Sequence, residues 1–307
     1  MNILITGATG SFGHVFVRFL LAHRKPERVV IYSRDEMKQE QMAQELGDNP
    51  CLRFFIGDVR DERRLEMAMH GITTVVHAAA LKIVPTAEYN PTECVATNIG
   101  GAENVVRASI RAGVRRVLAL STDKAVNPTN LYGATKLTAE RIFIAANSLG
   151  AGATRFSVLR YGNVVGSRGS VVPLFHRLRK EGKAFTITDG RMTRFWITLD
   201  QAVEFSINCL QTMTGGEVFV PKIPSMKIVD LAKAMSDDPN PAFEIIGIRP
   251  GEKLHETLIS EDESRYAHDH GSYFVIGRRP WNTGQEWSYR SDNNSNWLSI
   301  EDLRKIL

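Results

Sequence analysis

Cysteine is scarce in this sequence, and the few cysteines form no cluster with the spacing of metal ligands. The 307 residues include three cysteines, which lie far apart and show no CxxC spacing. This pattern argues against a disulfide framework and against a structural zinc site, so we expect no bound metal. The thiols are better explained as buried, inert side chains.

Long apolar runs and targeting signals are also absent. No stretch approaches the roughly 18 consecutive apolar residues that a membrane helix needs, so we expect no membrane partner. The start of the chain, MNILITGATG, has no basic n-region and no small-residue cleavage site, which argues against a signal peptide. Cytoplasmic residence is the default expectation that follows.

Charge is nearly balanced rather than concentrated. Lys and Arg number 38 and Asp and Glu number 34, which gives a formal net charge of +4. Basic residues are mixed with acidic ones, as in RDEMKQEQMAQE, so we expect no nucleic-acid partner. With 43% hydrophobic residues and no repeat or low-complexity tract, the composition excludes general disorder.

The first half of the chain alternates short β-branched runs with longer amphipathic segments. We expect strands at Asn2–Thr6, Arg28–Ser33, Leu52–Ile56, Thr73–His77, Val114–Leu120 and Arg155–Leu159. The amphipathic helical segments between them include Phe12–Ala22, Glu36–Leu46 and Pro91–Ala112. This rhythm predicts an α/β fold with a doubly wound parallel sheet and helices on both faces, as in the Rossmann fold.

The rhythm breaks down after Gly162, which indicates a second region. We place a Rossmann domain at residues 1–165, with a segment near 194–222 returning to it, and a smaller C-terminal region at residues 166–307. Val171–Glu181 has a helical pattern, and Ser299 can cap a helix that begins at Ile300.

A glycine-rich turn joins the first expected strand to the first expected helix. It reads GATGSFG, with GxxGxxG spacing. Glycine lets the backbone approach a pyrophosphate, and the helix N-terminus offers free N–H groups to that anion. The position at a strand–helix junction favours a dinucleotide site over a plain turn. The residues expected to form this cradle are Gly7, Thr9, Gly10, Ser11, Phe12 and Gly13.

The end of the second strand, Ser33-Arg34-Asp35, bears on the choice of dinucleotide. NAD-binding proteins usually place a carboxylate there for the ribose 2′-hydroxyl, whereas Arg34 suits a 2′-phosphate. We therefore predict NADP; the alternative is that Arg34 and Lys38 merely begin a solvated helix. Asp58, at the end of the third strand, is expected to accept a hydrogen bond from the adenine amino group unless it is an ordinary helix cap.

Tyr132 and Lys136 form a YxxxK motif, which places a phenol and an ammonium on one face of a helix. A nearby cation favours the phenolate, so such a tyrosine can act as a base toward a hydroxyl. The motif is common by chance and is usually a surface pair. Here it follows the fifth strand, which ends in Ser121-Thr122, in a chain that already has a dinucleotide cradle, and this context favours catalysis.

Several motifs together resemble a known family. TGxxGxxG at residues 6–13, three alanines at 78–80, Asn98 and the Tyr132/Lys136 pair are similar to extended short-chain dehydrogenases/reductases. AALKIVPTAEYNP, STDKAVNPTNLYGATK, RYGNVVGSRGSVVP and IRPGEKLHE more narrowly resemble bacterial nucleotide-sugar 4,6-dehydratases of the inverting, 5-epimerising kind. Those enzymes act on UDP-N-acetylglucosamine. The resemblance implies a UDP-sugar substrate, a role in polysaccharide biosynthesis, NADP as a recycling cofactor and a homo-oligomer.

The same resemblance implies roles for the residues around the fifth strand. Tyr132, supported by Lys136 and Thr122, would take the proton of the sugar C4 hydroxyl. Lys124 is implied as the base at C5 and Asp123 as the acid for the departing C6 hydroxyl, with hydride return to C6 and inversion at C5. Adjacent groups of opposite charge can hold different protonation states in one pocket, which favours these roles over a solvated Asp-Lys pair.

Further positions complete the expected site, and residues 166–307 would mainly bind the substrate. Besides the cradle, the dinucleotide-binding residues are expected to be Ser33, Arg34, Asp35, Lys38, Asp58, Val59, Ala78, Ala79, Ala80, Asn98, Tyr132, Lys136, Tyr161 and Asn163. The substrate-binding residues are expected to be Lys82, Asn163, Arg194, Arg249 and Glu252. Surface ion pairs are the alternative for the charged residues on the substrate side.

Other functions remain open at this point. A UDP-sugar 4-epimerase never eliminates water and would not need Asp123 and Lys124, whereas a retaining 4,6-dehydratase typically has Asp-Glu at that place. A non-catalytic dinucleotide-binding regulator could lose Tyr132 or Lys136 without penalty. The sequence keeps all four side chains, which favours an inverting dehydratase, a hydro-lyase.

Overall fold

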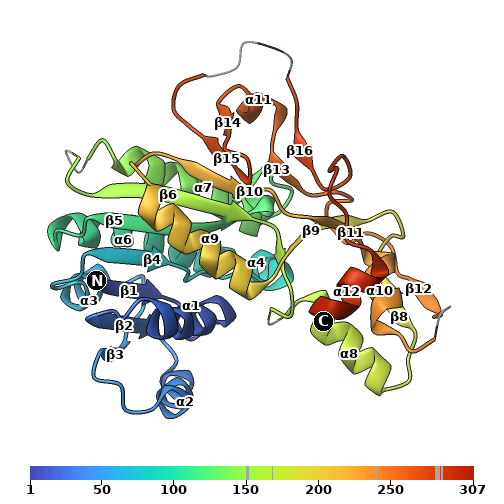
Figure 1. Ribbon diagram of the computed structural model, residues 1–307, viewed down its shortest axis with the longest axis horizontal. Coiled ribbons are helices and arrows are strands. Elements are labelled where there is room, and N and C mark those ends of the chain that lie inside the picture. Colours follow the sequence, from blue (N-terminus) through green and yellow to red (C-terminus); the bar gives the residue numbers. More distant parts are fainter. Residues whose placement is uncertain (150–151, 168, 239–240, 281–283, 285) are drawn as a thin grey trace.

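A large sheet forms the centre of the molecule (Figure 1). The computed structural model describes residues 1–149, 152–167, 169–238, 241–280, 284 and 286–307. The sheet has nine strands in the order β14-β15-β10-β6-β5-β4-β1-β2-β3. Their bounds are β1 Asn2–Thr6, β2 Arg28–Ser33, β3 Leu52–Ile56, β4 Thr74–His77, β5 Arg116–Thr122, β6 Arg155–Tyr161, β10 Val218–Pro221, β14 Ala267–Asp269 and β15 Tyr273–Ile276. From β3 to β10 neighbouring strands are parallel, and β15 and β14 are added antiparallel.

The six expected strands lie where the β-branched runs indicated. Strands buried on both faces read as continuous apolar runs, and β1 and β4 are buried along nearly their whole length for this reason. β5 and β6 each continue two residues beyond the expected end, to Thr122 and Tyr161. The predicted doubly wound α/β fold is confirmed.

Helices cover both faces of the sheet. α1 (Ser11–His23) and α9 (Leu199–Thr212) pack against each other, and their buried side chains, such as Phe16 and Val203, share one apolar cluster with the strands. α3 (Glu62–Ala68), α6 (Gly101–Arg111) and α7 (Leu131–Ala146) build a second cluster with the strands, which includes Leu65, Val105 and Phe143. α2 (Glu36–Leu46) follows β2 and matches its expected bounds.

The expected helix 91–112 is interrupted. It consists of α5 (Pro91–Val95), a π-helical turn η1 (Ala96–Gly100) and α6. The turn contains Asn98, whose side chain bonds both backbone polar groups of Leu81, with an N···O distance of 2.8 Å to the Leu81 N–H and 3.0 Å to its carbonyl. Such turns are frequent at functional sites because they re-aim a side chain.

A smaller second lobe lies beside the sheet, at the right of Figure 1. It contains α8 (Val171–Lys180), β8 (Phe185–Ile187), β9 (Thr193–Ile197), β11 (Ser225–Lys227), α10 (Ile228–Met235), β12 (Phe243–Ile245) and α12 (Ile300–Ile306). These elements share their own apolar core, in which Phe175, Trp196 and Leu303 are buried. Ser299 caps α12 in a reciprocal capping box with Asp302, as the sequence predicted.

The segment near 194–222 is divided between the two parts. β9 pairs with β11 and with β7 (Asn163–Val164), whereas α9 covers the large sheet and β10 is one of its strands. The extension of the sheet by β14 and β15 was not predicted, because strands of three and four residues that lie outside the regular strand–helix alternation carry too little signal to be recognised.

The remaining elements are short. They are α4 (Val84–Tyr89), the 3₁₀ turn η2 (Asp123–Ala125), β13 (Thr257–Ile259), α11 (Glu261–Ser264) and β16 (Tyr289–Arg290). Within the described residues, no helix has both the length and the apolar character that crossing a bilayer requires.

Candidate active site

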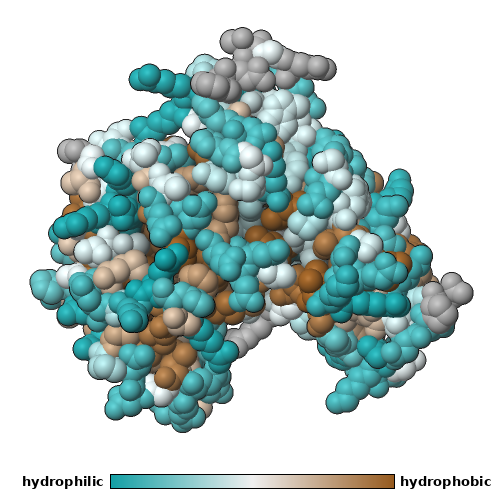
Figure 2. All heavy atoms as spheres, viewed as in Figure 1, coloured by the Kyte–Doolittle hydropathy of each residue, from teal (hydrophilic) through white to brown (hydrophobic). Residues whose placement is uncertain are grey.

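Two adjoining cavities lie where the sheet meets the second lobe. The first has a volume of about 690 Å³ and is lined by the glycine-rich turn and by residues at the carboxyl ends of β2, β4 and β5. The second, of about 520 Å³, is lined by α8, β9 and residues 249–256. Lys124 and Asn163 line both cavities. Ligands of open α/β sheets bind at this edge, and the surface is hollowed between the lobes (Figure 2).

The glycine-rich turn leaves room for an anion. Gly7 has φ +68°, and a Cβ there would lie 2.9 Å from the backbone of Ala79, while a Cβ on Gly13 would lie 2.2 Å from the Ala8 carbonyl oxygen. α1 then begins at Ser11, and no side chain caps its N-terminus. Its first backbone N–H groups therefore remain available to an anion. A dinucleotide pyrophosphate fits this cradle. All six expected cradle residues line the first cavity: Gly7, Thr9, Gly10, Ser11, Phe12 and Gly13.

The residues expected at the ribose end divide into two groups. Ser33, Arg34, Asp35 and Lys38 line the first cavity, and Asp35 caps α2 and pairs with Lys38 at 2.6 Å. Asp58 does not line the cavity. Its carboxylate is held by Arg60 at 2.7 Å and lies 3.4 Å from Arg34, so it orients Arg34. The cap of α3 is Asp61, not Asp58.

The wall near the middle of the sheet is also assembled as expected, with one exception. Val59, Ala78, Ala79, Ala80, Tyr161 and Asn163 line the first cavity. Asn98 is 2% exposed and lies behind the wall. Because it bonds the backbone of Leu81 and the Thr135 hydroxyl, it acts as a support for the loop after β4 rather than as a contact surface.

Tyr132 and Lys136 lie on the cavity face of α7, whose first turn is capped by Asn130. The Lys136 ammonium donates to the Leu120 carbonyl at 2.7 Å. Burial lowers the pKa of Lys136 to about 8, although Glu140 opposes the shift. Burial also raises the pKa of Tyr132 to about 12, with Lys124 and Thr122 acting against it. The sequence suggested a shift toward neutrality, and the direction here is the opposite because desolvation is the largest effect.

Asp123 and Lys124 occupy the turn η2, directly after β5. Asp123 is fully buried and accepts hydrogen bonds from the Thr122 hydroxyl at 2.9 Å and the Lys124 ammonium at 3.0 Å. Burial raises the pKa of Asp123 despite its lysine partner. Burial works against the charge of Lys124, yet Asp123 and Glu256 raise its pKa overall. Lys124 and Thr122 line the first cavity, whereas Asp123 is not among the lining residues of either cavity and reaches them through its contact with Lys124.

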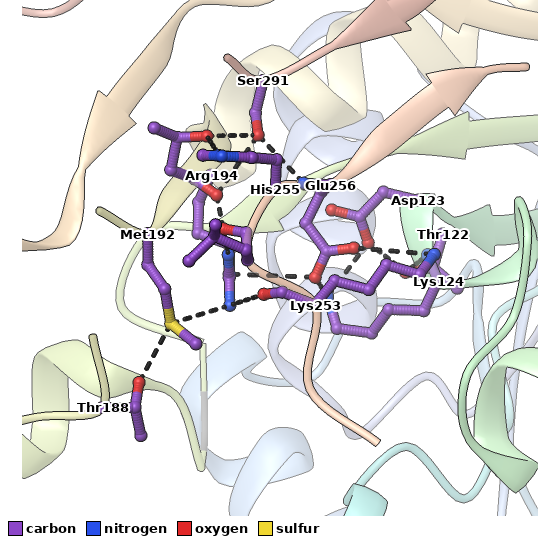
Figure 3. Close-up of polar contacts among 12 residues, drawn as sticks. Thr122, Asp123, Lys124, Thr188, Met192, Arg194, Lys253, His255, Glu256 and Ser291 are labelled. Atoms are coloured by element: carbon purple, nitrogen blue, oxygen red, sulfur yellow. Dashed lines mark hydrogen bonds and ion pairs between the residues drawn. The ribbon is translucent and has the colours of Figure 1, made fainter. Parts of the chain in front are cut away.

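Two charged residues at this place were not expected from the sequence. The Glu256 carboxylate, in a residue only 2% exposed, lies 3.2 Å from the Lys124 ammonium and 3.7 Å from the Arg194 guanidinium (Figure 3). Lys253 donates to the Val126 carbonyl and lies 4.0 Å from Glu256. Both belong to the quoted motif IRPGEKLHE, but the motif does not tell which of its charges turn inward.

The expected substrate-side residues are spread over the two cavities. Lys82 lines the first, and Arg249 and Glu252 line the second, where the Glu252 carboxylate accepts from the Arg249 N–H. Arg194 also lines the second cavity but is 9% exposed, and it donates to the carbonyls of Thr193, Lys253 and Leu254. The N···O distances from the guanidinium to these three carbonyl oxygens are 2.7, 3.0 and 3.0 Å, respectively. Arg194 is therefore engaged in fixing the backbone of residues 253–254.

No group of His, Cys, Asp or Glu side chains that could hold a metal ion occurs in the described part of the chain. The site thus combines a dinucleotide cradle, a buried Tyr-Lys pair and a buried Asp-Lys pair around one hollow. With a dinucleotide bound, such a site can oxidise and deprotonate a small polar substrate.

Comparisons with known proteins agree with this geometry. The sequence pattern of the family described as "Polysaccharide biosynthesis protein" matches residues 3–278. The UDP-N-acetylglucosamine 4,6-dehydratase (inverting) of Campylobacter jejuni is 52% identical, over 100% of this chain and 97% of that protein. The UDP-glucose 4-epimerase of Rickettsia rickettsii is 41% identical, over 100% of this chain and 95% of that protein.

Solved structures show the same fold. The crystal structure of Pen from Bacillus thuringiensis superposes with a TM-score of 0.91 and 41% identity, covering 99% of this chain and 95% of that one. The dTDP-glucose 4,6-dehydratase DesIV from Streptomyces venezuelae, with NAD bound, has a TM-score of 0.76. At 23% identity, covering 92% of this chain and 93% of that one, this second likeness concerns the fold alone.

Proposed function

The chain belongs to the polysaccharide biosynthesis protein family, and from this membership we propose that it is a UDP-N-acetylglucosamine 4,6-dehydratase that inverts C5. The observation that carries the proposal is the buried Asp123-Lys124 pair beside Tyr132. Lys124 lines both cavities and lies 3.0 Å from Asp123, so a base and an acid are available at one place. Elimination of water needs both groups, whereas a simple oxidation needs neither.

Tyr132 begins the reaction by accepting the proton of the C4 hydroxyl. Thr122 and Lys124 favour its phenolate, and Lys136 lies one turn further along the same helix. A nicotinamide dinucleotide bound in the first cavity would supply a reversible hydride acceptor for this oxidation. The residues that would hold it are the cradle glycines and the alanines at 78–80.

The C4 ketone makes the C5 proton acidic, and the elimination follows. Lys124, as the neutral amine, removes the C5 proton, and Asp123 protonates the C6 hydroxyl, which leaves as water. A C5=C6 double bond forms in the same step. Hydride at C6 and a proton delivered to the opposite face of C5 then give the 4-keto-6-deoxy-L-hexose, with net loss of one water.

The second cavity suits the UDP moiety. Arg249 and Arg177 line it and are exposed, so both can approach a diphosphate. Glu252 is assigned to the ribose, Asn163 to the junction of the two ligands, and Lys82 to the sugar side of the first cavity. In this assignment residues 166–307 mainly bind substrate, and Arg194 shapes the cavity from behind.

We assign NADP as the dinucleotide. Arg34 lies at the end of β2 with about half of its side chain exposed, oriented by Asp58, and a guanidinium at this place matches a 2′-phosphate. Assembly into a homo-oligomer and residence in the cytoplasm remain predictions from the sequence.

The experiment is incubation of the purified protein with UDP-N-acetylglucosamine in deuterated water, followed by mass spectrometry and proton NMR. Expected are the loss of one water, deuterium at C5 and an L-configured 4-keto-6-deoxy sugar. A product with the D configuration at C5 would instead identify a retaining dehydratase.

A UDP-sugar 4-epimerase is the second candidate, because relatives with that name are 41% identical over the whole chain. Epimerisation at C4 needs the dinucleotide and Tyr132 but eliminates nothing. An epimeric product of unchanged mass, without deuterium at C5, would therefore favour it and leave Asp123 and Lys124 without a role.

A further inference from the structure

We propose that Glu256 is a positioning residue of this reaction: its carboxylate aims the Lys124 amine at the cavity and keeps the working proton within the Asp123-Lys124 pair. The inference rests on the proposed function. It assigns a role to a side chain that is far from the pair in the sequence and adjacent to it in space.

The geometry places Lys124 between two carboxylates. Its ammonium lies 3.0 Å from Asp123 and 3.2 Å from Glu256, while about a quarter of its side chain is exposed toward the cavities. Figure 3 shows the Glu256 carboxylate pointing toward Lys124, and Glu256 itself belongs to the chain immediately before β13. Two acceptors on different elements leave the amine little freedom of orientation.

The backbone of Glu256 is itself anchored. Its N–H donates to the Ser291 hydroxyl at 2.9 Å, and Ser291 is fully buried and bonds the Thr193 hydroxyl at 2.7 Å. His255 lies 2.8 Å from the same Thr193 hydroxyl through Nδ1. Residues from three separate segments therefore fix the point from which the Glu256 carboxylate reaches Lys124 (Figure 3).

The two carboxylates have different surroundings, although both are buried. Burial opposes the charge of Glu256, but Lys124, Arg194 and Lys253 hold its pKa below the ordinary value. Asp123 is buried with Lys124 as its cation and Glu256 as a like charge, and its pKa is raised. Two carboxyl groups whose pKa values are pushed apart divide into one that stays ionised and one that can carry a proton.

This division gives the elimination its acid and its base. Transfer of one proton across 3.0 Å breaks an N–H bond of Lys124 and forms an O–H bond on Asp123, which yields a neutral amine and a neutral acid. The amine then takes the C5 proton while the acid gives its proton to the C6 hydroxyl. Lys124 is again an ammonium and Asp123 a carboxylate, and Glu256 has stayed ionised throughout.

Other charged groups face the pair and belong to the same titration. They are Lys82, whose pKa is lowered by burial and then by Lys124, and Tyr132, which Lys124 and Asp123 influence in opposite directions. Arg194 and Lys253 face Glu256. None of them lies between Lys124 and its two carboxylates in the described structure, so removal of the Glu256 charge acts first on the pair.

The test is the pH profile of kcat for Glu256→Gln. Without the carboxylate charge, both Asp123 and Lys124 lose a proton more readily. We therefore expect the acid limb and the alkaline limb to move together to lower pH by about one unit or more. We also expect kcat at the optimum to fall by about 10²-fold, with KM changed by less than about threefold, because positioning acts on the chemical step.

Glu256→Asp retains the charge but draws it back by one methylene. Its profile should stay at the wild-type pH while kcat falls by about tenfold. Glu261→Gln, on exposed α11 in the same stretch of chain, is the matched control and should behave as the wild type. Thermal unfolding and dinucleotide binding are measured for every variant.

The outcomes separate the possibilities. If Glu256→Gln binds dinucleotide and loses activity without a shift of either limb, Glu256 is a structural ion pair and the proposal is wrong. If Glu256→Gln does not fold, the test passes to Glu256→Asp, and a wild-type kcat for that variant would overturn the proposal. A wild type that eliminates no water defeats the proposed function, whereas a dehydrating wild type with an unaffected Glu256→Gln defeats this inference alone.

Discussion

Tyr132 is the side chain on which the first chemical step depends. Replacing it with phenylalanine removes the only atom placed to accept the C4 proton in our proposal and leaves the ring packing unchanged. We expect kcat to fall by about 10²- to 10⁴-fold, with dinucleotide affinity retained. Steady-state assays and fluorescence titration measure the two quantities. Tyr89→Phe, at a tyrosine that is 88% exposed on α4, is the matched control.

Arg34 tests the choice of dinucleotide at the same scale. Arg34→Ser removes the guanidinium that we assign to the 2′-phosphate, so NADP affinity should fall by about 10- to 100-fold while NAD affinity changes little. Titration with each dinucleotide is the measurement, with exposed Arg18→Ser as the control. An equal loss for both dinucleotides would assign Arg34 to packing rather than to phosphate recognition.

Single residues were predictable where their partners are near in the sequence. Tyr132 and Lys136 share a helix face, and the cradle glycines follow one strand, so spacing alone brought them together. Glu256 could not be found in this way, because its contact with Lys124 joins segments that are remote along the chain. The raised pKa of Tyr132 was missed for a related reason: burial depends on the whole fold.

At the scale of elements, the approach of α7 to η2 is set by one glycine. A Cβ on Gly133 would lie 2.2 Å from the Lys124 carbonyl oxygen, so Gly133→Ala must push the helix away from the turn. We expect a loss of about 1–3 kcal/mol in the free energy of unfolding, and kcat should drop because Tyr132 moves relative to Lys124. Gly100→Ala, where a Cβ meets nothing within 4 Å, is the control for both measurements.

A buried ion network ties three elements together behind the site. Arg160 on β6 is 1% exposed and pairs with Glu140 on α7 at 2.6 Å and with Glu263 on α11 at 2.9 Å. Arg160→Met leaves two carboxylates buried without their cation, which should destabilise the protein by about 3–5 kcal/mol. Urea unfolding at pH 7 measures this. Arg155→Met, at the exposed start of the same strand, should have little effect.

Elements were predictable in proportion to their length. The six strands of the first half were recognised because each is a short, mainly apolar run that alternates with a helical segment, and α2 matched its expected bounds. The π-helical turn at Ala96–Gly100 was not, since its cause is the pair of hydrogen bonds from Asn98 to Leu81. Strands as short as β14 carry no periodic signal of their own.

The stability of the whole molecule should depend on pH through His77. This histidine lies in the middle of the sheet, 2.8 Å from the Thr6 hydroxyl, and burial followed by the charge of Lys136 lowers its pKa to about 3. The unfolded chain protonates near 6.5 and the native state does not. Above pH 6.5 this histidine is neutral in both states and takes nothing from the free energy of unfolding. As the pH falls from 6.5 toward 3, the unfolded chain gains a proton that the native state does not, and the free energy of unfolding decreases.

Below the unfolded pKa of His77, this group should change the free energy of unfolding by at most about 1.4 kcal/mol per pH unit. Urea unfolding at about pH 7.5, above that window, and at about pH 6 and 5, within it, compares the wild type with His77→Gln. The variant should be less stable at neutral pH and less sensitive to acid. His176→Gln, at an exposed position on α8, should keep the wild-type slope; a variant at His77 with that same slope would contradict the prediction.

The packing of α12 on the second lobe also sets an order of events during synthesis. Leu303 is fully buried in the core that contains Phe175 and Leu231, so this core is complete only when residues near the end of the chain have been made. The strands β1 to β6 are synthesised before the elements of this core, and their packing is completed later by α9 and β10. Until α12 is made, the side of α10 that α12 covers in the folded protein stays open to solvent, so the core of the second lobe closes only when the last residues of the chain are in place.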